Sequence, residues 1–157
     1  MHRNFLLTVR RVRRAICIAA ALALTACSDP PRADPENEAQ VAQGERVYEA
    51  HCATCHGVSL EGQPNWRDRL ATGRLPAPPH DPSGHTWHHA DELLFSITKN
   101  GMGPHAPPDY NSDMPAFGAR LSDADIWAVL AYIKSTWPKE TREAQAAVTR
   151  EEARGRK

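Results

Sequence analysis

Cys52-Ala53-Thr54-Cys55-His56 is the most informative stretch of this 157-residue chain. Two thiols at this spacing match the two vinyl groups on one edge of a haem, and the imidazole beside them can bind the iron. A thioredoxin-like redox pair would lie in a βαβ pattern, which is absent. A structural zinc site would need two more ligands at paired spacing, and the sequence has no second C-x-x-C. The motif therefore predicts one covalent haem c, attached to Cys52 and Cys55, with His56 as an axial ligand.

Helical patterns flank the motif on both sides. Residues 36–52 contain no proline and have an apolar face made by Val41, Gly44, Val47 and Tyr48. Gly44 is unfavourable inside a helix, which indicates close contact with another helix. A second helix is predicted to begin at Ser122, a favourable N-cap, and to stop before Pro138. Its apolar positions are Ile126, Val129, Leu130, Ile133 and Trp137. A third helix is predicted at about residues 90–99, and the two outer helices are expected to cross and enclose something.

With these elements placed, residues 43–138 resemble the class I c-type cytochromes. The resemblance implies an all-α small cytochrome c fold, with three to five helices around one covalent haem and crossing N- and C-terminal helices. It also implies a second axial ligand at Met114, in the string Met114-Pro115-Ala116-Phe117-Gly118, which follows His56 by 58 residues. The alternatives are Met102 and a histidine, the candidates being His80, His85, His88, His89 and His105. By the same resemblance, a carbonyl in residues 76–79 accepts the second ring N–H of His56.

The middle of the domain holds further candidates. Trp66, Arg74 and Trp87 are possible donors to the haem propionates, because buried carboxylates need hydrogen-bond donors. The plain alternatives are packing for the tryptophans and a solvated surface for the arginine.

Histidines are concentrated in residues 80–89, and the string His85-Thr86-Trp87-His88-His89 is shared with a group of bacterial cytochromes c. Copper or zinc could be bound by His85 with His88 or His89, because imidazole suits both ions. The alternative is that Thr86 or a neighbour caps the third helix while the histidines hydrogen-bond to propionates, backbone or water.

The two ends of the chain differ from the middle. Residues 1–26 have the arginines and the twelve-residue apolar run of a signal peptide, which is shorter than the roughly 20 residues of a membrane span. Leu24-Thr25-Ala26-Cys27 resembles a bacterial lipobox, so Cys27 is predicted to carry lipid; ordinary cleavage to a soluble periplasmic protein is the alternative. Residues 27–39 are expected to be a flexible tether, residues 40–138 the cytochrome c domain, and residues 139–157 a polar, solvated or frayed tail.

A function follows from the predicted ligands. With His56 and Met114 bound, the iron has no open position, which favours a periplasm-facing electron carrier between respiratory or oxidoreductase partners and disfavours an enzyme with a small-molecule substrate. Two alternatives stay open. One is a peroxidase-like haem enzyme or a gas sensor with an open distal site, where the histidines and Arg67, Arg69 or Arg74 would act. The other is a copper-handling protein that uses residues 80–89.

Charge gives an expectation about partners. The whole chain is neutral, but residues 1–26 hold five arginines and no acid, so their removal leaves fourteen basic and nineteen acidic side chains, a net charge of −5. This balance argues against nucleic-acid binding. We expect transient contacts with basic faces of redox proteins, weakened by salt, beside attachment to a membrane through the lipid.

Overall fold

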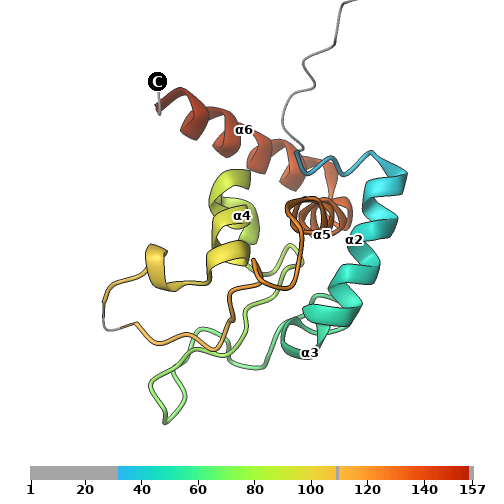
Figure 1. The fold of residues 1–157 in the computed structure, drawn as a ribbon. Helices are drawn as coiled ribbons and strands as arrows, with labels where there is room; N and C mark the ends of the chain where they lie inside the picture. Colours follow the sequence, from blue (N-terminus) through green and yellow to red (C-terminus); the bar gives the residue numbers. More distant parts are fainter. Residues whose placement is uncertain (1–31, 109, 156–157) are drawn as a thin grey trace, which may run out of the picture. The chain divides into compact units, whose positions relative to one another are not determined.

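The computed structural model describes residues 32–108 and 110–155, and these belong to one compact unit. The predicted signal peptide and Cys27 lie outside the described residues. The α-helices are α2 (Glu38–His51), α3 (Ala53–His56), α4 (Asp91–Asn100), α5 (Asp123–Ser135) and α6 (Lys139–Gly155), with short 3-10 turns η2 (Thr86–His88) and η3 (Gly103–His105). No strand occurs in the described ranges, so the predicted all-α fold with three to five helices is confirmed (Figure 1).

The helices α2 and α5 cross, as the sequence predicts. Their closest approach is at Gly44, where a Cβ atom would lie 1.9 Å from the carbonyl oxygen of Ala128. Only a residue without a side chain fits there. The start of α5 is fixed by a capping box, in which the Ser122 hydroxyl accepts from the Asp125 N–H and the Asp125 carboxylate accepts from the Ser122 N–H, each at 3.1 Å.

Two apolar clusters share α5. The first contains Ile126, Trp127, Leu130 and Ala131 of α5, together with Ala33, Leu94, Phe117 and Leu121. The second contains Val129 and Ile133 of α5, together with Tyr48, Ala53, Leu60 and Trp137. Both clusters are built on α5. This helix therefore connects α4 and the loop that precedes α5 on one side to α2 and α3 on the other (Figure 1).

The structure describes residues 32–39 of the predicted tether of residues 27–39, and these residues make defined contacts. Ala33 is buried in the first cluster. The Gln40 side chain donates to the carbonyl of Arg32 at 3.0 Å and accepts from the Asp34 N–H at 2.8 Å. Asn37 then caps α2 by accepting from the Gln40 N–H. A few polar side chains thus hold a segment whose composition alone suggests a tether.

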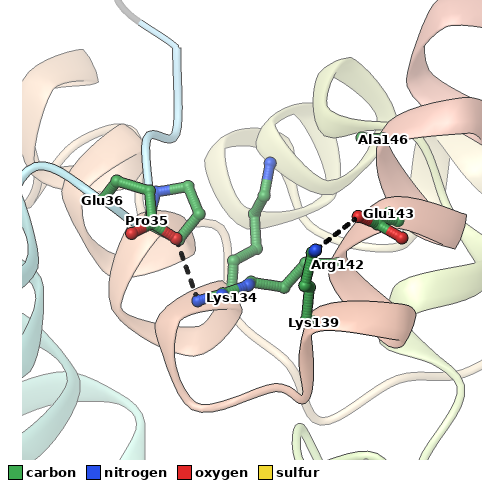
Figure 2. A pocket seen from close by; sticks show the side chains of 7 residues that line it. All are labelled: Pro35, Glu36, Lys134, Lys139, Arg142, Glu143 and Ala146. Carbon is green, nitrogen blue, oxygen red and sulfur yellow. Dashed lines mark ion pairs between the residues drawn. The ribbon is translucent and has the colours of Figure 1, made fainter.

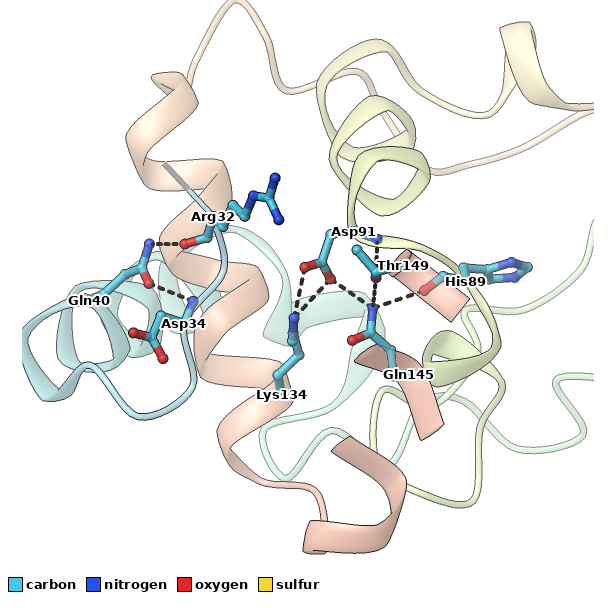
Figure 3. A network of polar contacts seen from close by, with 8 residues as sticks. All are labelled: Arg32, Asp34, Gln40, His89, Asp91, Lys134, Gln145 and Thr149. Atoms are coloured by element: carbon cyan, nitrogen blue, oxygen red, sulfur yellow. Dashed lines mark hydrogen bonds and ion pairs between the residues drawn. The ribbon is translucent and has the colours of Figure 1, made fainter. Parts of the chain in front are cut away.

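Residues 139–155, which were expected to be part of a solvated or frayed tail, form the helix α6. Gln145 is completely buried, and its amide donates to Asp91 Oδ1 at 2.7 Å and to the His89 carbonyl at 3.1 Å. Both carboxylate oxygens of Asp91 accept from Lys134 Nζ at 2.9 Å (Figure 3). The helix is therefore docked through polar groups, which a search for an apolar stripe does not detect.

Candidate functional site

The C-x-x-C-H motif directly follows α2. The Cys52 N–H donates to the Tyr48 carbonyl at 2.8 Å, and the His56 N–H donates to the Cys52 carbonyl at 2.9 Å. The hydroxyl of the fully buried Tyr48 donates to the Gly57 carbonyl at 2.9 Å, just after the motif. The motif is thus held in a short helical turn against the second cluster, and neither of its cysteines forms a disulfide.

His56 is buried, and its ring is oriented by the backbone. Its Nδ1 lies 2.8 Å from the Pro78 carbonyl, inside the predicted range 76–79. Because a carbonyl only accepts, Nδ1 carries the proton and Nε2 has the free lone pair. Burial lowers the pKa of His56, and the bond to Pro78 opposes this shift in part. A neutral imidazole with one nitrogen held by a carbonyl is the usual form of a metal-binding histidine.

The two thiols differ in their surroundings. Cys52 is half-buried against the second cluster, while Cys55 is exposed. Burial, and to a smaller extent Cys55, raises the pKa of the Cys52 thiol to about 11.

Met114 is half-buried and packs against the first cluster. The loop that carries it is tied to the end of α4, because the N–H groups of Phe117 and Gly118 donate to the carbonyls of Thr98 and Lys99 at 3.0 and 2.9 Å. Met102 is also half-buried, at the junction between α4 and η3. The loop of Met114 is therefore anchored at Phe117, a residue of the first cluster, and at the following Gly118.

Among the histidines of residues 80–89, His80 has the ring that contacts the C-x-x-C-H motif. Its ring stacks on that of His56, with 4.0 Å between the centroids and 23° between the planes. The other histidines make different contacts: His85 stacks on Trp66, His88 stacks on Trp87, and His105 lies within hydrogen-bond distance of Ser96. The sequence placed His80 among possible sixth ligands and did not predict this stacking.

Comparison with known proteins agrees with this arrangement. The family model "Cytochrome c" matches residues 41–137, well over half of the chain. The chain belongs to the cytochrome c family. Cytochrome c6 of Bumilleriopsis filiformis is 30% identical over 101 residues, which cover 62% of this chain and 92% of that protein. Cytochrome c6 of Leptolyngbya boryana is 34% identical over 95 residues, covering 60% and 91%. Comparison with solved structures found no match.

Membership in the cytochrome c family makes this chain an electron-transfer haem protein with covalently bound haem c, as predicted. The donor set on this structure fits that cofactor. Two cysteine sulfurs and a neutral, oriented imidazole lie within five consecutive residues. Met114 as the second iron ligand stays a prediction. The class I resemblance is confirmed at the level of the family.

The predicted propionate donors make other contacts in this cytochrome. The Trp87 indole N–H donates to the Pro82 carbonyl at 3.3 Å, and half-buried Trp66 lies between His85 and the Arg67 guanidinium. Arg74 forms an ion pair with Asp113, the residue before Met114. A role for these three residues toward the propionates stays a prediction.

A second metal bound by two histidines of residues 80–89 stays an open alternative. Across residues 32–108 and 110–155, no group of three or more His, Cys, Asp or Glu side chains converges as a metal site. His85 and His89 meet edge to face with centroids 5.4 Å apart, and burial lowers the pKa of both.

A separate pocket of about 320 Å³ lies at the start of α6 (Figure 2). It is lined by Pro35, Glu36, Lys134, Lys139, Arg142, Glu143 and Ala146. Its three cations are all paired: Arg142 with Glu36 at 3.2 Å, Lys139 with Glu143 at 3.6 Å, and Lys134 with Asp91. With its charges already neutralised, this pocket lacks the features of an ion-binding site.

Proposed function

We propose that this cytochrome is a monohaem electron carrier in which Cys52 and Cys55 attach the haem and His56 and Met114 are the axial ligands. When bound, haem c supplies a one-electron redox centre. The observation that carries the proposal is the 2.8 Å contact between His56 Nδ1 and the Pro78 carbonyl. It leaves Nε2 as the metal-binding nitrogen, directly after the two thiols.

The protein's contribution is to hold its ligands still. Pro78 fixes the imidazole, and the bonds from Phe117 and Gly118 to the end of α4 fix the loop of Met114. Ligands held in one place by the fold need little rearrangement when the charge changes, which favours fast electron exchange. With His56 and Met114 both bound, the iron would have no position open to oxygen or peroxide.

The proposed location is the periplasm, with a lipid anchor at Cys27 and a soluble periplasmic protein as the alternative. None of the helices in the described part of the chain is sufficiently long and apolar for a membrane span. The chain after residue 26 has a net charge of −5, which favours transient partners with basic faces. Mass spectrometry of the mature N-terminus tests the anchor: diacylglycerol on Cys27 is expected, and an unmodified N-terminus contradicts it.

Two methionine variants test the axial ligand in the purified haem-loaded protein. Met114→Ala should lose the weak near-infrared band of the iron–sulfur bond and should bind carbon monoxide in the reduced state. Met102→Ala is the matched control, because Met102 is equally half-buried but lies at the α4 and η3 junction; it should keep the band. Loss of the band in Met102→Ala, or its absence from the parent, contradicts the assignment.

A further inference from the structure

The stacked pair of His80 and His56 adds a second restraint to the proposed axial ligand. The Pro78 carbonyl holds one edge of the His56 ring, while the face of the ring lies against His80 with centroids 4.0 Å apart. A ring packed against this face opposes rotation of the imidazole, which a single hydrogen bond at one edge leaves partly free.

His80 is itself held at three points. Its N–H donates to the Leu60 carbonyl at 2.8 Å, and its carbonyl accepts from the Trp137 indole at 2.7 Å. Its ring Nδ1 lies 2.8 Å from the hydroxyl of Thr86. The backbone bonds place the residue, and the bond to Thr86 sets the direction of the ring.

Thr86 is well suited to this task. It is buried, and its hydroxyl donates to the Pro79 carbonyl at 3.5 Å. The bond between His80 Nδ1 and the Thr86 hydroxyl, at 2.8 Å, is the shorter of the two and holds the His80 ring in either tautomer. Thr86 begins η2, the turn in the histidine-rich string, and α6 packs against η2. The string therefore has a contact with the motif through Thr86 and His80.

We propose that Thr86 and His80 are positioning residues that fix the plane of the His56 imidazole and thereby tune the electronic state of the haem iron. This inference rests on the proposed function, in which His56 is an axial ligand. The plane of an axial imidazole decides which iron d orbital its π system overlaps. Residues that orient a metal ligand therefore alter the properties of the metal without contacting the metal themselves.

The experiment uses the haem-loaded protein, with electron paramagnetic resonance of the oxidised state and a redox titration at one fixed pH. Thr86→Val keeps the shape of the side chain but removes the hydroxyl, and His80→Leu removes the stacked ring. Both variants should shift the largest g value and the midpoint potential from those of the parent. Thr86→Ser keeps the hydroxyl and should therefore keep the g value and the midpoint potential of the parent.

The matched control is His88→Ala. His88 lies in the same turn as Thr86 but is exposed and stacks on Trp87, so this variant should keep the parent spectrum and potential. Because Thr86→Val removes only a hydroxyl, it keeps the test decisive if His80→Leu does not fold.

The possible failures are distinguishable. If folded Thr86→Val shows the parent g values and potential, or if Thr86→Ser is shifted as much as Thr86→Val, the positioning role is wrong while His56 stays the ligand. If His56→Ala retains the parent low-spin spectrum, His56 is not an axial ligand, and the proposed function fails together with this inference.

Discussion

The indole N–H of Trp137 donates to the backbone carbonyl of His80 at 2.7 Å, across 57 residues of sequence. Trp137 follows α5 and is only 3% exposed, so this bond joins the second cluster to the segment that packs on His56. The end of one crossing helix thus supports the surroundings of the proposed iron ligand. The sequence predicted Trp137 only as an apolar position of its helix.

Trp137→Phe should lower the free energy of unfolding by about 1–3 kcal/mol, because the partly buried His80 carbonyl loses its donor. Thermal unfolding of the haem-loaded protein measures this loss. Trp87→Phe is the control, since the half-buried Trp87 donates to Pro82 at a longer 3.3 Å. An equal loss in both variants would contradict a special role for the bond to His80.

Gly44→Ala should be among the most damaging small substitutions in the chain. The added Cβ would lie 1.9 Å from the Ala128 carbonyl oxygen and 2.8 Å from Tyr132 Cβ, so α2 and α5 must separate. Overpacking of this kind costs about 1–3 kcal/mol or more. Gly103→Ala is the control because no heavy atom lies within 4 Å of its added Cβ. A parent-like melting temperature in Gly44→Ala would show that the helices can move apart at little cost.

Lys134→Met should destabilise the protein by about 3–5 kcal/mol, because it leaves the Asp91 carboxylate buried without its cation. The side chains of this pair are only 9% and 10% exposed. Replacing both partners, as Lys134→Met with Asp91→Leu, should recover part of the loss. Lys139→Met breaks the exposed pair with Glu143 and should cost less than about 1 kcal/mol. Denaturant titrations that find equal losses for the two lysines would contradict this difference.

Ser122→Ala should cost about 1 kcal/mol by removing the N-cap of α5.

The hydrogen bond from the Ser122 hydroxyl, and next that from Gln43, lowers the pKa of Asp125 below its ordinary 3.8. A carboxylate with a lowered pKa stabilises the fold above pH 3.8, and this contribution is lost as the pH falls through the folded-state pKa. The stability gap between the parent and Asp125→Asn should therefore be constant near neutral pH and shrink in acid. A gap that grows in acid would contradict the assignment.

Features that depend on local pattern could be predicted from the residues alone. The C-x-x-C-H spacing predicted covalent haem c, and family membership confirms that cofactor. Apolar positions at helical spacing, Ser122 as a cap and Gly44 as a close contact predicted α2, α5 and their crossing, because helix periodicity and capping act over a few residues. The ligand roles of His56 and Met114 stay predictions for the experiments above.

Contacts between residues that are distant in sequence could be seen only in the folded chain. The docking of α6 depends on Gln145 reaching Asp91, a polar contact across 54 residues that hydrophobic periodicity cannot detect. His80 could be an iron ligand, a copper ligand or a surface residue on sequence grounds. Its stacking on His56 follows from the turn at Leu60, from Thr86 and from Trp137, whose three bonds to His80 exist only once the chain has folded.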